Sequence, residues 1–177
     1  MSRIHIEQLT KIEYPQAIAP LAEILHQCVE QGASVGFIQP FTLAKSTAYW
    51  QGKLLECISS ERQFLWVAKA QSLIVGCVIL DIDTPPNQQH RADVAKLLVH
   101  PNYHRQGIAK QLMLSIEQQA LLLERSLLVL DTKTGDSAQN LYSSLGYKTA
   151  GIIPEFALNP ALDGYAATTI MYKNLLK

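Results

Sequence analysis

The most constraining feature of the sequence is a strand–helix–strand pattern between residues 91 and 132. RADVAKLLV at 91–99 has the composition of a β-strand, and apolar residues recur at helical spacing from 105 to 123. SLLVLDT at 126–132 is short and almost wholly apolar, which is typical of a central strand buried on both faces. Two strands joined by one helix in the same sheet run parallel, with a right-handed crossover. The sequence therefore predicts a parallel strand pair around this helix.

The rest of the chain adds strands and helices whose order limits the fold further. Thr42 is a candidate N-cap for the second helix, and Gly146 is a candidate C-cap for the last one. The predicted strands are 2–9, 63–70, 72–83, 148–158 and 165–175, and the remaining helices are 17–30, 42–58 and one that begins at 136 or 137. We predict a single α/β (α+β) domain over residues 1–177, with a mixed, mostly antiparallel sheet of about seven strands flanked by about four helices.

Composition excludes several classes of function. The 177 residues contain 15 basic and 15 acidic side chains, so a general affinity for nucleic acid or anionic lipid is not expected. The three cysteines, Cys28, Cys57 and Cys77, are widely spaced, which favours buried, reduced thiols over a disulfide. No metal site is expected, because Pro101 interrupts any helix that would carry both His100 and His104.

Two absences bear on localisation. The N-terminal residues lack the apolar core of a signal peptide, and no segment reaches the apolar length of a membrane span. We expect a soluble, cytoplasmic protein without a membrane partner.

The segment LLVHPNYHRQGIAKQLM, residues 97–113, places a short basic loop between a strand and a helix. The free N–H groups and the dipole at the start of a helix favour a phosphate there. Gly107 is followed by neither the Lys-Ser/Thr of a Walker A loop nor the further glycines of a dinucleotide fingerprint. The loop predicts a phosphorylated ligand; the alternative is a helix start whose charges are only solvated.

Two motifs resemble those of the GNAT superfamily of N-acetyltransferases. Residues 97–113 are similar to its motif A, in which a strand, V-x-P and R/Q-x-x-G-x-G/A precede a helix, and SAQNLYSSLGY at 137–147 is similar to its motif B. The two motifs stand in the family's order, and the predicted order of strands and helices also fits. His104 replaces the usual Arg or Gln, and Gly135 replaces a frequent Asn.

This resemblance implies acetyl-coenzyme A (acetyl-CoA) as co-substrate. Its pantetheine arm would pair with the main chain of the strand before the loop, and a main-chain N–H near Leu98 would hold the carbonyl oxygen. The pyrophosphate would lie on the backbone amides of the loop. The implied cofactor-binding residues are Leu97, Leu98, Val99, His104, Arg105, Gln106, Gly107, Ile108, Ala109 and Lys110.

Three residues are candidates for catalysis. Tyr142 matches the motif B tyrosine, which the resemblance implies as the acid for the departing thiolate; alternatively it only packs the helix on the sheet. Asp131 follows a buried strand, where partial desolvation would raise its basicity, but it is equally suited to a turn. Asp93 is predicted to share a strand face with Ala95, Leu97 and Val99, and its alternative is a surface partner of Arg91 or Lys96. The two acids together would bind a cationic amine and remove its proton.

The acceptor is predicted to be the primary amine of a small molecule, such as an amino-acid-like metabolite, a toxin or an antibiotic. The segments DTKTGDSAQNLYSSLGY and GIIPEFALNPALDG resemble the branch that includes the tabtoxin-resistance acetyltransferase, and Glu155 and Asp163 in the second are candidates for binding the amine. The alternatives are a protein N-terminal or lysine acetyltransferase and a non-catalytic acyl-CoA sensor. A homodimer is an option, since related domains often dimerise.

Overall fold

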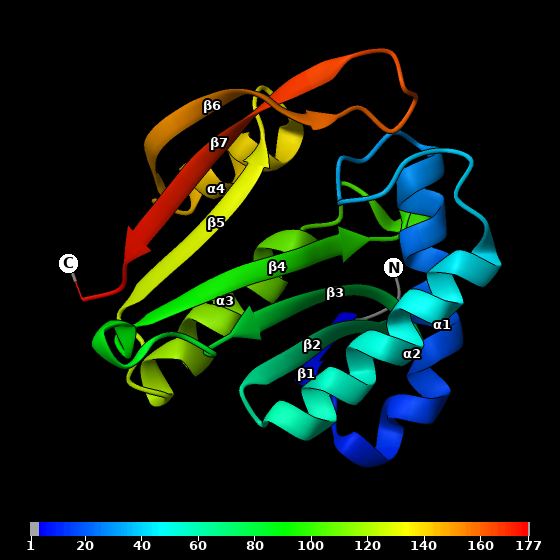
Figure 1. The fold of residues 1–177 in the computed structure, drawn as a ribbon. Coiled ribbons are helices and arrows are strands. Elements are labelled where there is room, and N and C mark those ends of the chain that lie inside the picture. The colour runs from blue at the N-terminus through cyan, green and yellow to red at the C-terminus, as the bar shows by residue number, and fades with distance from the viewer. Residues whose placement is uncertain (1–3, 177) are drawn as a thin grey trace.

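The computed structural model describes residues 4–176, in which seven strands form one sheet (Figure 1). The strands are β1 (Ile4–Gln8), β2 (Gln63–Ala70), β3 (Leu73–Asp81), β4 (Arg91–Val99), β5 (Leu127–Lys133), β6 (Lys148–Leu158) and β7 (Tyr165–Asn174). The helices are α1 (Tyr14–Glu30), α2 (Leu43–Ser60), α3 (Ile108–Leu122) and α4 (Ser137–Ser144), with short 3-10 turns η1 (Lys11–Glu13), η2 (Pro86–Gln88) and η3 (Pro101–Tyr103). Among these helices, none is both long and apolar enough to span a bilayer.

The strands lie in the order β1-β2-β3-β4-β5-β7-β6. Every neighbouring pair is antiparallel except β4 and β5, which are parallel and joined through α3. The predicted fold class and the parallel pair are therefore confirmed. The strand predicted at 2–9 occupies Ile4–Gln8, and residues 2 and 3 lie outside the described range.

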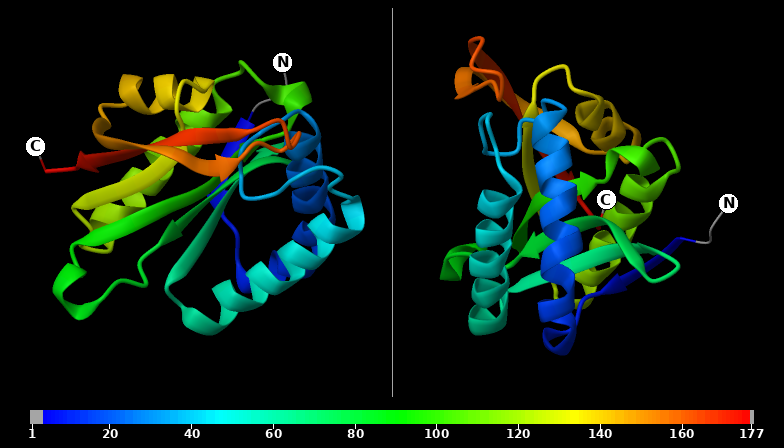
Figure 2. Two further views of the ribbon diagram at one scale, coloured as in Figure 1. Left: turned by 45° about the horizontal axis from the view of Figure 1, so that its top comes forward. Right: turned by 90° about the vertical axis from the view of Figure 1, so that its right-hand side faces the viewer.

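The helices cover both faces of the sheet (Figure 2). On one face, α1 and α2 enclose a core that includes Leu21, Leu25 and Trp50; on the other, α3 packs through Leu112 and Ile116. Local signals set the helix starts. The Thr42 side chain accepts a hydrogen bond from the Lys45 N–H, as predicted for an N-cap, and α1 begins three residues earlier than predicted because a proline suits its first turn.

Two sequence expectations need correction. The helix predicted from residue 105 begins at Ile108, because Arg105 (φ 59°) and Gly107 (φ 76°) have left-handed backbone conformations that a helix excludes. Strand β5 is not buried on both faces. Leu128 and Leu130 are buried, whereas Leu127 and Val129 are only half-buried on the opposite face.

The two parallel strands separate part-way along their length. Only Arg91, Ala92 and Asp93 of β4 pair with β5, although β5 continues along β7 as far as Lys133. A bulge gives β4 one extra residue, since Cys77 pairs with Leu98 and Ile79 pairs with Ala95. Bulges bend a strand and increase its twist. Residues 94–99 therefore diverge from β5 and leave a wedge in the middle of the sheet (Figure 1).

Helix α3 approaches the sheet closely at Gly76 of β3. A Cβ built on Gly76 would lie 3.0 Å from the Leu98 carbonyl oxygen and 3.3 Å from both Ile108 Cγ2 and Leu112 Cδ1. The missing side chain lets the first turn of α3 rest against β3 beside the end of β4. The position of the loop before α3 thus depends on this glycine.

We predict that Gly76→Ala lowers the free energy of unfolding by about 1–3 kcal/mol, because the added methyl group overpacks a region that includes backbone. Denaturant unfolding followed by circular dichroism would measure the change. Gly52→Ala is the matched control: it lies inside α2 with no atom within 4 Å of its Cβ position, so it should raise stability by up to about 1 kcal/mol. Equal stability of wild type and Gly76→Ala would contradict the close approach.

Candidate active site

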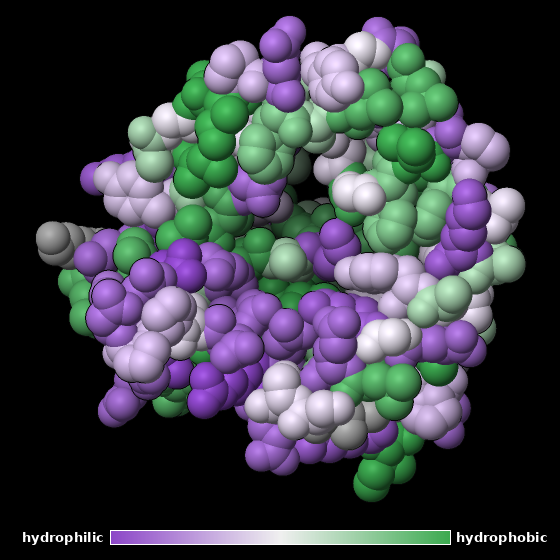
Figure 3. All heavy atoms as spheres, viewed as in Figure 1, coloured by the Kyte–Doolittle hydropathy of each residue, from purple (hydrophilic) through white to green (hydrophobic). Residues whose placement is uncertain are grey.

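A cleft of about 1170 Å³ runs through the wedge between β4 and β5. Figure 3 shows its mouth as a hollow near the centre of the face that carries α1 and α2. On the α3 and α4 side its walls are residues 97–99, the loop 103–110 and the first residues of α4. On the α1 side they are the loop 31–36, Lys96 and part of β6 and β7. The cleft therefore connects the two faces of the sheet.

The loop before α3 presents a run of backbone donors to this cleft. Within the described residues, the N–H groups of Arg105 to Lys110 donate no hydrogen bond to the protein, since the first bond of α3 runs from the Gln111 N–H to the Gly107 carbonyl. The left-handed conformations of Arg105 and Gly107 turn the chain on either side of Gln106. Successive amides around such turns form anion-binding concavities, and the helix dipole adds to them. Together with the cationic side chains of Arg105 and Lys110, this geometry suits a diphosphate.

His104 has a role that the motif did not reveal. Its Nε2 lies 2.8 Å from the Val99 carbonyl oxygen, which also accepts a hydrogen bond of 3.5 Å from the Cys28 thiol. The imidazole thereby ties the loop to the end of β4.

Tyr142 reaches the cleft from α4. The helix ends in a Schellman motif, in which the Tyr147 N–H bonds to the Tyr142 carbonyl and the Gly146 N–H bonds to that of Ser143. The rings of Tyr142 and Tyr147 pack with centroids 5.8 Å apart. Burial, reinforced by the negative charges of Asp131 and Asp136, raises the pKa of the Tyr142 phenol well above its ordinary value. The phenol is therefore protonated at neutral pH and able to donate a proton.

Asp131 lines the cleft but is exposed, not partly desolvated as the sequence predicts. The reason is the wedge. Pairing between β4 and β5 ends at Val129, two residues before Asp131, so β4 does not lie beside Asp131. The Thr168 hydroxyl donates a 3.2 Å hydrogen bond to its Oδ2. Asp131 thus stands at the cleft wall, held by the neighbouring strand β7.

Asp93 lies outside the lining of the cleft, so the structure does not bring it to Asp131 as a pair. It pairs with Arg91 (Nη2 to Oδ2, 3.3 Å), and burial raises its pKa. The predicted face is also wrong. Leu97 and Val99 pack in the core on the α3 side with Ala92 and Val94, because the bulge reverses the alternation of β4 after Ala95.

Neither predicted acceptor-binding acid lines the cleft. Glu155 is exposed in an irregular part of β6, and Asp163 is exposed in the β6–β7 loop. The neighbour of Glu155, Phe156, does contribute to the cleft wall. The backbone irregularity of β6 between Ile153 and Ala157, which the sequence did not predict, sets which side chains face inward.

Several residues of the cleft escaped the sequence analysis. Lys96 and the loop 31–36 line it, and the Lys96 ammonium donates to the Val35 carbonyl at 2.9 Å. The one sequence signal that pointed to Lys96 was its position between the apolar residues at the end of the predicted strand 91–99. Within residues 4–176, no group of three His, Cys, Asp or Glu side chains is arranged to hold a metal ion.

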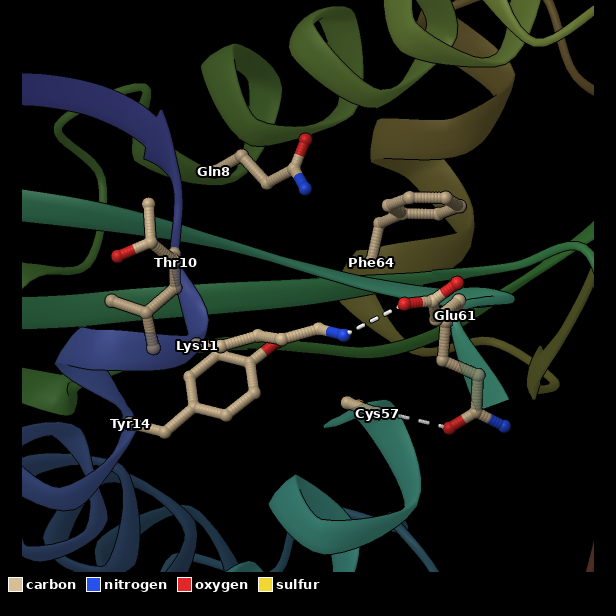
Figure 4. A pocket seen from close by; sticks show the side chains of 9 residues that line it. Gln8, Thr10, Lys11, Tyr14, Cys57, Glu61 and Phe64 are labelled. Carbon is tan, nitrogen blue, oxygen red and sulfur yellow. Dashed lines mark hydrogen bonds and ion pairs between the residues drawn. The ribbon is translucent and has the colours of Figure 1, made fainter. Parts of the chain in front are cut away.

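A smaller pocket of about 350 Å³ lies between β1, β2 and the ends of α1 and α2 (Figure 4). The Lys11–Glu61 ion pair (3.0 Å) borders it, and the Cys57 thiol lies 3.7 Å from the Gln63 side-chain oxygen. Burial raises the pKa of Cys57 to about 11, so this thiol is neither charged nor reactive at neutral pH. We assign no chemistry to this pocket.

Comparison with known proteins agrees with the geometry of the larger cleft. A family model described as "Acetyltransferase (GNAT) domain" matches residues 61–149, which include β4, the loop, α3, β5 and α4. The chain belongs to the GNAT family of acetyltransferases.

Two curated human proteins share part of this sequence. N-acetyltransferase 8 is 36% identical over 96 residues, which cover 53% of this chain and 42% of that protein. N-acetyltransferase 8B is 39% identical over 88 residues, covering 49% of this chain and 39% of the relative. The chain thus spans less than half the length of the curated relatives that it matches.

Solved structures match over nearly the whole chain. An N-acetyltransferase from Staphylococcus aureus Mu50 has a TM-score of 0.77 at 18% identity, covering 98% of this chain and 99% of the other. The structure of yncA from Salmonella typhimurium with its cofactor acetyl-CoA has a TM-score of 0.75 at 16% identity, with coverage of 97% and 94%. The ribosomal-protein-S18-alanine N-acetyltransferase of Escherichia coli scores 0.68 at 21%, with coverage of 98% and 94%. At these identities the likeness shows the fold.

The three cysteines yield a prediction for thiol chemistry. Cys28, Cys57 and Cys77 are free thiols with at most 6% of their surface exposed, and burial raises the pKa of both Cys28 and Cys57 to about 11. At pH 8 we expect the native protein to react slowly with a disulfide reagent and the denatured protein to release three equivalents at once. Rapid labelling of native protein would contradict the burial.

Proposed function

We propose that the chain transfers the acetyl group of acetyl-CoA to the primary amine of a small molecule, by direct attack in a ternary complex. One observation carries this proposal: a single cleft joins the anion-binding loop, the buried phenol of Tyr142 and an opening on the opposite face of the sheet. A cofactor and an acceptor entering from the two faces would meet inside the wedge. Membership of the GNAT family supports the same reaction.

The residues present fit acetyl-CoA. The unpartnered amides of Arg105 to Lys110 suit its pyrophosphate, and the side chains of Arg105 and Lys110 add positive charge. Residues 97–99 have no paired strand on the β5 side, and apart from the Val99 carbonyl, which His104 and Cys28 already contact, their main chain would be available to the pantetheine amides. When bound, acetyl-CoA supplies a thioester whose carbonyl carbon is open to attack by an amine.

Two side chains have the right character for moving protons. Tyr142 holds its phenolic proton in the cleft at neutral pH and would donate it to the thiolate that leaves. Asp131 of β5 presents an exposed carboxylate to the cleft. It would bind the incoming ammonium and accept its proton, directly or through water. Asp93 lies outside the cleft lining, so it would act on the reaction only indirectly, through its ion pair with Arg91.

A small acceptor is favoured over an extended peptide by the loops beside the cleft. The Gln39 N–H donates a 2.8 Å hydrogen bond to the Pro160 carbonyl, which links the loop after α1 to the β6–β7 loop (Figure 1). The loop after α1 lines the cleft through residues 31–36, and the strands on either side of the β6–β7 loop line it through Phe156, Ala157 and residues 166–168. We infer that this bridge would obstruct an extended peptide beside the cleft, which argues against a protein N-terminus or lysine as acceptor.

Further parts of the proposal rest on the sequence. We infer a cytoplasmic enzyme with a detoxifying or resistance activity, related to the tabtoxin-resistance branch. A homodimer through the edge strand β6 is consistent with the exposure of Ile152, Ile153 and Phe156 on it. Light scattering would measure the oligomeric state.

We predict that Tyr142→Phe lowers kcat by about 100-fold or more while the affinity for acetyl-CoA changes little, because only the proton donor is lost. The measurement is release of free CoA thiol with a panel of amino acids, polyamines, aminoglycosides and short peptides. Tyr147→Phe is the matched control, since it removes a hydroxyl from the adjacent buried ring, which is not part of the cleft wall.

An unchanged kcat in Tyr142→Phe would keep the enzyme but remove this role from the phenol. Acetyl-CoA binding without thiol release for any amine would favour the acyl-CoA sensor. The short peptides distinguish the remaining alternative: acetylation of peptides in preference to small amines would replace the small-molecule proposal with a protein acetyltransferase.

A further inference from the structure

The side chain of Lys96 is fixed at the wall of the cleft. Lys96 is the left-handed residue of the β4 bulge (φ 53°), and its carbonyl accepts a hydrogen bond from the buried Cys77 thiol at 3.6 Å. Its ammonium donates to the Val35 carbonyl at 2.9 Å and lies 5.6 Å from the ring centroids of both Phe37 and Tyr49. Two aromatic rings and a carbonyl therefore hold a positive charge in one place.

This ammonium has no anionic partner in the protein. Among the described residues, no carboxylate lies within 4.0 Å of its Nζ. Two other half-buried lysines have acidic partners: Lys69 pairs with Glu7 and Glu13, and Lys173 pairs with Glu117 at 2.6 Å. Lys133, which also lines the cleft, donates instead to the Asn159 side-chain oxygen at 2.9 Å. Burial lowers the pKa of Lys96, and the positive charge of Lys53 lowers it further. A partly desolvated cation that faces a cleft is thus left ready for an anion.

The opposite charge stands on the other diverging strand. Asp131 of β5 lines the same cleft, and its negative charge acts on Lys96 without forming an ion pair. The acceptor side of the wedge therefore presents a cation on one strand and an anion on the other. A ligand that carries both an ammonium and a carboxylate complements this arrangement.

We propose that Lys96 binds a carboxylate of the acceptor, so that the substrate is an amino acid or a close derivative whose amine is directed towards Asp131. This inference rests on the proposed acetyl transfer and narrows its substrate class. Arg105 and Lys110 lie in the loop before α3 and its first turn, on the side assigned to the diphosphate. The third cation, Lys133 at the end of β5, already donates to the Asn159 side-chain oxygen at 2.9 Å, so Lys96 is the lysine assigned to the acceptor carboxylate.

The test compares matched acceptors that differ only in the carboxylate. Acetyl transfer is measured as kcat/KM for several L-amino acids, for the carboxamide of each, and for the amine that lacks the group altogether. We expect the wild type to favour the free acids by about 10- to 100-fold, the range of a hydrogen bond to a charged group. The carboxamides have less basic amines, so a larger fraction of each is neutral and nucleophilic at pH 8. Intrinsic reactivity therefore favours the carboxamides, and a preference for the free acids would have to come from binding.

The variant Lys96→Met removes the charge and keeps an unbranched side chain that is one heavy atom shorter. It should lower kcat/KM for the acids to the level of their carboxamides and leave the carboxamide values within about threefold. Lys53→Met is the control, because it removes an equal charge near Lys96 from a residue outside the cleft lining, and it should preserve the wild-type preference. Thermal unfolding of each variant reports on folding separately.

Different failures have different meanings. Amine-dependent turnover with no preference for acids would overturn the carboxylate site alone. An equal loss for acids and carboxamides in Lys96→Met would also overturn it, and would assign Lys96 to holding the loop at Val35. No turnover with any amine would overturn the acetyl-transfer proposal and, with it, this inference.

Discussion

The structure depends on the point at which β4 stops pairing with β5. Three residue pairs join the strands, and beyond Asp93 and Val129 each strand follows a different neighbour. The extra residue of the β4 bulge bends the strand away, and Gly76 lets α3 remain close to it. If β4 and β5 stayed paired along their whole length, hydrogen bonds between the two strands would leave no space for a cleft in the sheet. The wedge is what allows backbone groups of β4, side chains of β5 and the phenol of Tyr142 to face a common space.

Much of this fold was predictable from the sequence. The alternation of residues, the Thr42 N-cap and the strand–helix–strand unit gave the order of elements and the parallel pair, because these signals are local or follow from chirality. The basic loop at Gly107 was predicted as an anion site, and there the structure shows six amides that have no partner among residues 4–176. These amides belong to the backbone, so the unusual His104 does not remove them.

Features that depend on backbone irregularity were not predictable. Periodicity assumes regular strands, so the bulge at Lys96 made the predicted strand face of Asp93 wrong, and nothing in the pattern marked Lys96 as part of a cleft. The exposure of Asp131 follows from the separation of two strands distant in sequence. Glu155 and Asp163 fall outside the cleft because β6 is irregular next to Phe156. In each case the deciding contact lies between segments that no local pattern connects.

The most direct test of this account is to record the amide resonances of the ¹⁵N-labelled protein while CoA is added. The account predicts that the largest shifts fall on the N–H groups of residues 105–110, with further shifts along 97–99, because the former would bind the pyrophosphate and the latter the pantetheine arm. Shifts confined to other regions, such as the pocket around Lys11 and Cys57, or no shifts at saturating CoA, would contradict it.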